Sequence, residues 1–390
     1  MVNWKEKTLG EVTSFITKGI PPKYSDYESE STIWVLNQKC NRNFEISYAD
    51  ARLHDYNFKK VPENKMLMNG DVLINSTGTG TAGRVAQLQN IKKPTTIDGH
   101  MILLRPTDDI DSLYYGYAIK SCQSQIEGLA EGSTGQTELN RKRLQDEIII
   151  KYPVDKQEQK AIAYFLLDLD EKIKINVKIN NNLEEQAQSI YKQMFIDNAS
   201  SDWTEGTLSD IADITMGQSP SSSSYNEDRN GIIFFQGRAE FGFRFPTVRL
   251  YTTEPKRMAC ANDTLMSVRA PVGDLNVAHT DCCIGRGLAA IHSKDNHQAF
   301  VLYTMFSLKK QLDVFNGEGT VFGSINRNSL NEMPLLIPSS KKLDEFEALV
   351  SSIDVAIRNN YDENCYLKQL RDSLLPKLMS GELDVSNIDF

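Results

Sequence analysis

A glycine pattern within residues 73–88 is the feature of this sequence most typical of chemistry. Gly78, Gly80 and Gly83 have the spacing G-x-G-x-x-G after a short apolar run, and Asp98 stands twenty residues after Gly78. In dinucleotide-binding folds such glycines let the backbone approach a phosphate at the start of a helix, and the later acidic residue binds the ribose. The pattern by itself is that of a turn that binds a dinucleotide or S-adenosylmethionine.

A cofactor-binding turn needs a helix directly after its glycines, because the phosphate lies at that helix N-terminus. The segment that follows here, RVAQLQNIKKPTTID, is short, contains Pro94 and leads directly to the next strand-like run. We therefore expect no cofactor, and glycines that let the backbone come close to a ligand or to another strand. A methyltransferase that binds S-adenosylmethionine at residues 78–83 stays open as the alternative.

Other residues that do chemistry show no arrangement typical of an active site. The six cysteines have no C-x-x-C spacing, the five histidines form no H-E-x-x-H motif, and no Walker A sequence occurs. We therefore expect no metal site and no catalytic residues of the chain's own. No apolar run approaches the ~20 residues of a membrane span, and the N-terminus lacks an apolar signal core. These features predict a cytoplasmic protein.

The chain contains an internal duplication. Four stretches of the first half match stretches of the second half in the same order: residues 4–12 with 203–211, 69–85 with 261–275, 97–106 with 284–293, and 131–153 with 317–338. Such ordered self-similarity predicts two copies of one structural unit. The second copy of the glycine stretch reads SVRAPVG and keeps only Gly273, which argues against a cofactor site.

A long segment with helical periodicity follows each copy, at about residues 155–195 and 341–379. Apolar residues recur in steps of three and four, which predicts two long antiparallel helices with a coiled-coil-like seam. Leu349 is counted among the apolar positions of the second segment. The seam residues that we predict are Ile162, Leu169, Ile173, Asn180, Leu183, Ile190, Ile353, Ile357, Asn364, Leu367 and Leu374. Asn180 and Asn364 stand at equivalent places, either in the seam to fix its register or on the solvent face.

The globular parts, called heads here, combine strand-like runs with a helix-like stretch before the last strand. The predicted fold class is α+β, with two similar heads separated by the two long helices in a pseudo-twofold repeat. We expect the first head at residues 1–154, a central spacer helix at 155–197, the second head at 198–338, and a distal spacer helix with a C-terminal tail at 339–390.

Several stretches resemble the specificity (S) subunit of type I restriction–modification systems. The resemblance covers essentially the whole chain, and its most specific pieces are IWVLNQKCNRNF (33–44), FFQGRAEFG (234–242), LMSVRAPVGDLN (265–276), CIGRGLAAI (283–291) and LLPKLMSGELDV (374–385). It implies that each head is a target recognition domain for half of a split sequence in double-stranded DNA. It also implies that the helices dock two methyltransferase (M) subunits, with restriction (R) subunits joining through the complex, and that this chain is not itself an enzyme.

Side chains that read base edges are mainly arginine, lysine, asparagine and glutamine. The matched loops supply the DNA-contact residues that we predict: Gln38, Lys39, Thr79, Arg84, Arg141, Lys142 and Arg143 in the first head, and Gln236, Arg238, Ser267, Arg269, Arg286 and Arg327 in the second. Because the heads differ in sequence, the two half-sites are expected to differ too. A coiled-coil scaffold whose heads bind protein stays open as a third interpretation.

The charge of the heads predicts weak DNA binding by the chain alone. Residues 1–154 hold 19 basic and 19 acidic groups, and residues 198–338 hold 12 and 15. Since neutralisation of phosphates drives nonspecific affinity for DNA, heads with net charges of 0 and −3 have little positive charge to contribute. We expect partner subunits to supply much of the charge that clamps the DNA.

Overall fold

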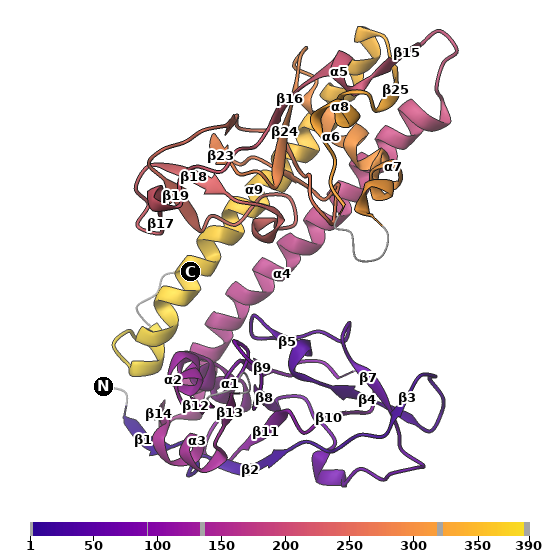
Figure 1. The fold of residues 1–390 in the computed structure, drawn as a ribbon. Helices are drawn as coiled ribbons and strands as arrows, with labels where there is room; N and C mark the ends of the chain where they lie inside the picture. The colour runs from indigo at the N-terminus through magenta and orange to yellow at the C-terminus, as the bar shows by residue number, and fades with distance from the viewer. Residues whose placement is uncertain (1–2, 92, 133–136, 318–322, 386–390) are drawn as a thin grey trace. The chain divides into compact units, whose positions relative to one another are not determined.

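The computed structural model describes residues 3–91, 93–132, 137–317 and 323–385. The chain divides into two compact units, one made of Met1–Ile175 with Glu363–Phe390 and the other of Asn176–Asp362. Each unit therefore contains one head and half of each long helix (Figure 1). Among the described helices, none combines the length and apolar composition needed to cross a membrane.

The first head is built from two four-stranded sheets and shorter two-stranded ones. One four-stranded sheet has the order β2 (Thr13–Lys18), β11 (Met101–Pro106), β8 (Val72–Asn75), β9 (Val85–Gln87), and the other has the order β10 (Thr95–Ile97), β4 (Thr32–Leu36), β7 (Arg52–Asp55), β3 (Tyr24–Ser25). The shorter sheets pair β1 (Trp4–Thr8) with β14 (Ile149–Pro153), β5 (Asn41–Arg42) with β6 (Glu45–Ile46), and β12 (Ala130–Glu131) with β13 (Glu138–Leu139).

The second head repeats this topology. The order β16 (Ala212–Met216), β24 (Leu288–Ser293), β21 (Thr264–Ser267), β22 (Leu275–Val277) corresponds to β2-β11-β8-β9. The other sheet adds one strand, with the order β17 (Tyr225–Asn226), β19 (Leu250–Thr252), β18 (Ile232–Phe235), β23 (Cys282–Ile284), β20 (Met258–Ala259), and β15 (Thr204–Thr207) pairs with β25 (Pro334–Ile337). The parallel pairs β4–β10 and β18–β23 are also equivalent. The duplication predicted from the sequence is thus present in strand order and direction.

Short helices cover the sheets of both heads. They are α1 (Ser112–Ser121), α2 (Gln123–Gly128) and α3 (Arg141–Glu147) in the first head, and α5 (Leu208–Ile211), α6 (Gln298–Ser307), α7 (Lys309–Leu312) and α8 (Arg327–Asn331) in the second. The helical stretch predicted in each head is divided, at Cys122 between α1 and α2 and at Leu308 between α6 and α7. Asp111 caps α1, since its carboxylate accepts from the backbone N–H groups of Leu113 and Tyr114.

The long helices are α4 (Lys156–Lys192) and α9 (Ser340–Ser380), and within each unit their halves pack antiparallel. In the first unit Asp170 of α4 accepts from Arg371 of α9 at 2.6 Å, and Ile173 accepts through its carbonyl from Asn364. In the second unit the Asn180 amide donates to the carbonyl of Ile357 at 3.1 Å. The α+β fold class with two long packed helices is confirmed.

The two seam asparagines occupy equivalent places in the two units. A shift of 184 residues converts Asn180 into Asn364 and Ile357 back into Ile173, so the same amide-to-carbonyl bond occurs once in each unit. Both asparagines are buried, and the solvent-face interpretation is therefore wrong. A polar pair of this kind fixes the register of two packed helices, because any slip leaves a buried amide without a partner.

The other predicted seam residues are buried or half-buried. Ile162, Ile173 and Ile357 are buried, while Leu169, Leu183, Ile190, Ile353, Leu367 and Leu374 are half-buried. Several of them pack against the core of a head as well as against the other helix. Leu349 is a correction, since its side chain is 54% exposed and lies outside the seam.

A tyrosine–aspartate hydrogen bond fastens each head to its helix half. The hydroxyl of Tyr117 in α1 donates to Asp170 of α4 at 2.8 Å, and the hydroxyl of Tyr303 in α6 donates to Asp354 of α9 at 2.9 Å. Asp170 and Asp354 are again 184 residues apart. Because these carboxylates lie under the heads, each needs a buried cation beside it.

The cation comes from a different element in each unit. In the first unit Lys120 of α1 lies 3.5 Å from Asp170 and over the ring of Phe44. In the second unit Arg244, from the loop before β19, lies 3.5 Å from Asp354 and 3.2 Å from Glu184. Burial works against ionised Asp170, but Lys120 and Arg371 outweigh it and lower its pKa. Burial dominates at Asp354, so that its pKa is raised.

Candidate nucleic-acid interface

The glycine turn of the first head is part of a β-hairpin. β9 follows the glycines and pairs antiparallel with β8, so the glycines do not lead into a helix as they do in a dinucleotide-binding turn. Gly83 has φ +88°, and a Cβ atom there would lie 2.7 Å from the Cα of Glu127 in α2. Its counterpart Gly273 has φ +82°, and a Cβ atom there would lie 2.9 Å from the Cβ of Leu312 in α7. The glycine kept in both copies thus serves close packing of the turn against a helix.

Three segments of the first head meet at this turn. The side chain of Asn75 donates to the carbonyl of Gln38 at 3.0 Å, which fixes the short 3-10 helix Gln38–Cys40 beside the end of β8. Thr77 and His100 are joined by a hydrogen bond of 2.8 Å between Oγ1 and Nδ1. The predicted residues Gln38, Lys39 and Thr79 therefore belong to one surface, together with His100, which sequence reasoning missed.

Arg84 closes the turn from its other side. Its guanidinium donates to the carbonyl of Gly80 at 3.0 Å, and the side chain is half-buried. The bond bridges the loop that carries Thr79, so Arg84 supports the shape of the turn whether or not it also contacts DNA.

The β13–α3 segment borders the same turn. The backbone N–H of Gly78 donates to Thr137 at 3.3 Å, Thr77 forms a β-bridge with Glu138, and Lys18 pairs with the Glu138 carboxylate. Residues 133–136, part of the stretch matched between the halves, lie outside the described residues. The segment brings α3, with its three basic residues, next to the turn.

The basic residues of α3 differ in their charge balance. Lys142 pairs with Asp146 at 3.2 Å, and Arg143 pairs with both Glu147 and Glu131. Arg141 is exposed. Burial of Lys65 lowers the pKa of that lysine, and the positive charge of Arg141 lowers it further. The positive potential of α3 is thus concentrated at Arg141, at the N-terminal end of the helix.

The second head gathers its predicted residues at the equivalent place. Gly285 and Gly287 pack against the backbone of Gln236, where a Cβ atom on either would lie 2.7 Å or 3.1 Å from the Gln236 carbonyl oxygen. Arg286, between the glycines, is exposed and donates its backbone N–H to the Ser219 hydroxyl. These glycines therefore bring Arg286 next to Gln236.

The turn after β21 is stabilised by a buried serine hydroxyl. The hydroxyl of Ser267 donates to the carbonyl of Pro271 at 2.7 Å and accepts from the backbone N–H of Asp274 at 2.9 Å. Ser267 is 1% exposed, so the prediction that it contacts DNA is not supported by its position. It shapes the turn that presents Arg269, which is exposed and forms a β-bridge with Ser324.

Arg238 and Arg327 complete the surface of the second head. Arg238 is the first residue of the short 3-10 helix Arg238–Glu240, the place that Gln38 occupies in the helix Gln38–Cys40 of the first head. Arg327 is the first residue of α8, which Asn326 caps, as Arg141 is the first residue of α3, which Asn140 caps. Residues 318–322, part of the matched stretch, lie outside the described residues.

A family model for the type I restriction modification DNA specificity domain matches residues 1–185 and 200–357. These two ranges contain most of the chain and one head each. The chain belongs to this family. It is the DNA specificity (S) subunit of a type I restriction–modification system, a non-catalytic component of that complex.

Known specificity subunits are similar along their whole length. The chain is 27% identical to a Methanocaldococcus jannaschii protein provisionally assigned as the MjaX specificity subunit, over 98% of this chain and 94% of that one. It is 21% identical to the HindI specificity subunit of Haemophilus influenzae, over 98% and 100%. A crystal structure of the S subunit from M. genitalium has the same fold, with a TM-score of 0.59 at 18% identity and coverage of 97% and 96%.

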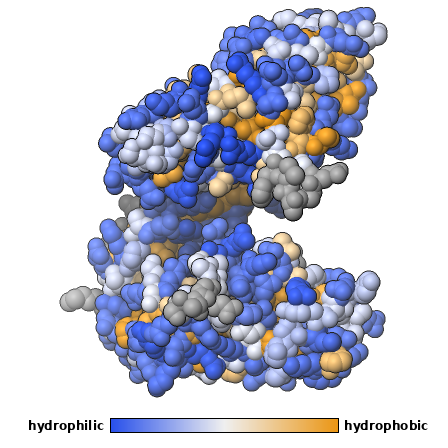
Figure 2. All heavy atoms as spheres, in the orientation of Figure 1, coloured by the Kyte–Doolittle hydropathy of each residue, from blue (hydrophilic) through white to orange (hydrophobic). Residues whose placement is uncertain are grey.

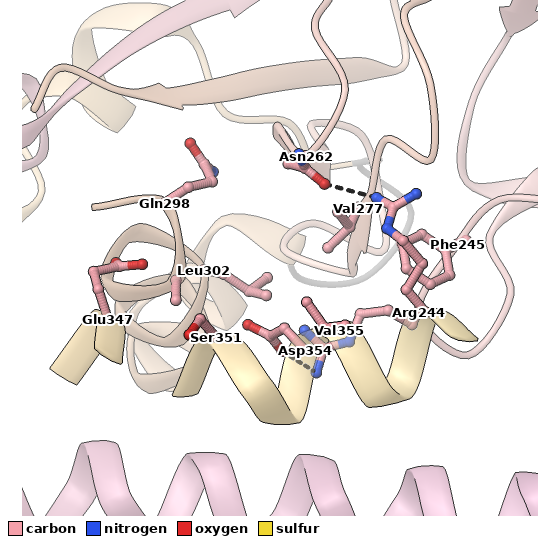
Figure 3. A pocket seen from close by; sticks show the side chains of 12 residues that line it. Arg244, Phe245, Asn262, Val277, Gln298, Leu302, Glu347, Ser351, Asp354 and Val355 are labelled. Atoms are coloured by element: carbon pink, nitrogen blue, oxygen red, sulfur yellow. Dashed lines mark hydrogen bonds and ion pairs between the residues drawn. The ribbon is translucent and has the colours of Figure 1, made fainter. Parts of the chain in front are cut away.

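A pocket of about 280 Å³ in the second unit of this S subunit is lined by described residues other than the predicted DNA contacts. Gln298 and Leu302 of α6, residues of α9 and Phe245 line it, and Figure 3 shows Arg244 beside Asp354 of α9. Burial acts against ionised Glu347 in the same wall, and its pKa is raised. The pocket is thus lined in part by Arg244 and Asp354, the ion pair that holds the second head against α9.

Metal-ligating side chains do not cluster in the part of the chain that the structure describes. Cys282 and Cys283 are buried in β23, where burial raises the pKa of the Cys282 thiol to about 12. A thiol with so high a pKa is protonated at neutral pH and unreactive.

Proposed function

We propose that this S subunit recognises a bipartite, asymmetric sequence in double-stranded DNA. Residues 1–154 and 198–338 are the two target recognition domains, each reading one half-site, and residues 155–197 and 339–390 supply the spacer helices and the tail. The observation that carries the proposal is the repeated strand topology of the heads with different side chains at equivalent loop positions. Two related but unequal heads suit two unequal half-sites.

Equivalent positions of the two heads differ in ways that change base readout. Gln38 of the first head corresponds to Arg238, His100 corresponds to Gly287, and Arg84 corresponds to Asp274. Arginine forms a bidentate contact with guanine, whereas glutamine forms one with adenine. The two half-sites are therefore expected to share little sequence.

The proposed contacts with DNA are Gln38, Lys39, Thr79, Arg84 and Arg141 in the first head, and Gln236, Arg238, Arg269, Arg286 and Arg327 in the second. We also propose that Lys142 and Arg143 contact DNA phosphates, which replace the acidic side chains that these residues now pair with. Most of the surface seen in Figure 2 is hydrophilic, with hydrophobic residues in small groups. Heads without excess positive charge favour base readout over phosphate binding, so we propose that the assembled complex supplies the DNA clamp.

We propose that two M subunits dock on the free faces of the long helices and that R subunits join through the complex. Exposed apolar side chains support this assignment: Tyr164, Ile175 and Tyr366 in the first unit, and Val177, Ile179, Leu349 and Val355 in the second. A shallow hollow on α4, lined by residues that include Gln186 and Ile190, adds to the second set. Leu166, Tyr191 and Leu375 of the same helices are buried within the units and do not belong to this docking surface.

The test is co-expression of the chain with its M subunit, followed by mapping of modified bases across the host genome. A split motif of two different half-sites is the expected result. Replacement of residues 1–154 by the equivalent head of another S subunit is expected to change one half-site only. Unmodified DNA, or a head replacement that leaves the motif intact, would contradict the proposal.

A further inference from the structure

Arg238 is presented by a rigid backbone. The 3-10 helix Arg238–Glu240 begins three residues after the end of β18, and the carboxylate of Glu240 accepts from the backbone N–H of Gly237 at 3.1 Å. The backbone N–H of Phe241 donates to the Arg238 carbonyl at 3.0 Å. Half of the Arg238 side chain is exposed, at 53%, so a fixed backbone carries a side chain that DNA can reach.

A carboxylate holds the guanidinium of Arg238 through one edge. Arg238 Nε pairs with Oδ2 of Asp274, and Oδ1 of the same carboxylate pairs with the Lys309 ammonium at 3.1 Å. Burial opposes the ionised form of Asp274, but the hydrogen bonds from Arg238 and Lys309 outweigh it and lower its pKa. Asp274 is therefore a carboxylate at neutral pH with both oxygens engaged.

The position of Asp274 is itself fixed. Its backbone N–H donates to Ser267 Oγ and its carbonyl accepts from the Ser267 N–H, both at 2.9 Å. Lys309, at the start of α7, also donates to the carbonyl of Val272 at 3.1 Å. The chain of contacts from α7 through Asp274 to Arg238 thus leaves the guanidinium little freedom.

Contact through Nε leaves the Nη1–Nη2 edge of the guanidinium for another partner. Within the residues that the structure describes, Arg238 has Asp274 as its ion-pair partner and no other. Two parallel N–H donors on a planar group match O6 and N7 of guanine in the major groove. An arginine already fixed in orientation loses less side-chain entropy on binding than a free one.

We propose that Arg238 reads a guanine in the half-site of the second head and that Asp274, supported by Lys309, is the positioning residue that orients it. This inference rests on the proposed function of the heads as DNA readers. The first head lacks this arginine–carboxylate pair, because Gln38 and Arg84 stand where Arg238 and Asp274 stand in the second. Substitution of Arg238 or Asp274 is therefore expected to change base preference in one half-site only.

Charge and positioning predict opposite results for Asp274→Asn. The substitution removes a negative charge from the surface proposed to face DNA, so electrostatics alone predicts tighter binding to all sequences. Loss of positioning predicts a weaker preference for one base, because the fork of Arg238 is no longer held. The two effects are separable when binding is measured base by base.

The experiment uses the full chain assembled with its M subunits and a DNA library in which each base of both half-sites is varied in turn. For wild type one guanine position of the second half-site is expected to be strongly preferred. Arg238→Lys and Asp274→Asn are each expected to reduce that preference about 10-fold to 100-fold, since a bidentate contact is worth about 1–3 kcal/mol. Preferences in the first half-site are expected to stay within twofold of wild type.

Matched controls are Arg229→Lys and Asp295→Asn, at exposed positions in other loops of the same head. Both are expected to keep the wild-type preferences, and Asp274→Glu, which retains a carboxylate, is expected to recover part of the guanine preference. An Asp274→Asn variant that keeps the full guanine preference, or Arg238→Lys with unchanged base preferences, would overturn the inference. A wild-type complex with no split preference would instead contradict the proposed function itself.

Discussion

At the scale of single residues, Lys120 is the group whose chemistry the fold changes most. Its ammonium lies 4.2 Å from the centre of the Phe44 ring and 3.5 Å from Asp170, and its side chain is 12% exposed. Burial lowers the pKa of Lys120 to about 8, although Asp170 acts in the opposite direction. The folded state therefore holds this proton less tightly than the unfolded chain does.

The lowered pKa of Lys120 predicts how stability depends on pH. Below pH 8 the amine is charged in both states, and between pH 8 and 10.5 only the unfolded chain keeps the proton. The free energy of unfolding of wild type is thus expected to rise across this window relative to Lys120→Met, by roughly 2–3 kcal/mol. Urea unfolding at several pH values measures it, with exposed Lys160→Met as the control. A difference that falls as pH rises would show that the sign is wrong.

The glycines of the hairpin turn differ in what an added methyl group would meet. Gly80 has φ +68° with open space around it, whereas at Gly83 the methyl would overlap the backbone of α2. Gly80→Ala is expected to cost about 1 kcal/mol from backbone strain alone. Gly83→Ala is expected to cost at least about 3 kcal/mol, since rigid overlap is added. Urea midpoints of the two variants make the comparison, and equal losses would contradict it.

At the scale of elements, the two long helices take their register from polar as well as apolar contacts. Asn180 accepts from Asn360 at 2.8 Å while it donates to Ile357, and Asn364 donates to Ile173 in the other unit. Apolar residues on both sides of each asparagine pack into the core of the adjacent head. The same helix residues therefore contribute both to the pairing of the two helices and to the packing of the heads against them.

Replacement of Asn180 by leucine tests what the seam asparagine contributes. Because a buried polar residue fixes register at a cost in stability, Asn180→Leu is expected to raise the free energy of unfolding by about 1 kcal/mol. Asn181→Leu, on the exposed face of α4, is the matched control and is expected to change it by less than about 0.5 kcal/mol. A clear loss of stability in Asn180→Leu would mean that the hydrogen bonds outweigh the apolar gain.

At the scale of the whole molecule, the duplication gives each unit the same plan with different polar details. Each head is fastened by a tyrosine to an aspartate of a long helix, and the cation that the head itself places beside that aspartate comes from α1 in one unit, where Arg371 of α9 adds a second, and from a loop in the other. Since each head has its own cation, an exchanged head must carry both its tyrosine and its cation to be fastened properly.

Lengthening both helices tests the proposed role of the helices as spacers. Insertion of seven residues into α4 within 170–190, with a matching seven in α9, keeps the seam pattern and adds about 10 Å of helix. Since one base pair occupies about 3.4 Å, the unread stretch between the half-sites is expected to grow by about three base pairs. Mapping of modified bases measures the spacing, with insertion into α4 alone as a control expected to break the seam. An unchanged spacing would contradict the role.

The amino-acid sequence by itself determined the duplication, the α+β heads and the two long helices. Periodicity and ordered repeats are local or nearly local signals, and the family resemblance was confirmed along the chain. Errors occurred where periodicity was followed too far, as at Leu349, whose step of three from Phe346 points away from the seam. The two short breaks at Cys122 and Leu308 were missed for the same reason.

Only the tertiary structure decided which polar groups meet. Thr77 and His100, Arg238 and Asp274, and Tyr117 and Asp170 come from segments that are distant along the chain, and no spacing rule joins them. It also showed that the hydroxyl of Ser267, one of the predicted contacts, forms its hydrogen bonds within its own turn. Burial and hydrogen-bond satisfaction depend on the packed whole, because a polar group commits to whichever partner the fold places within about 3 Å of it.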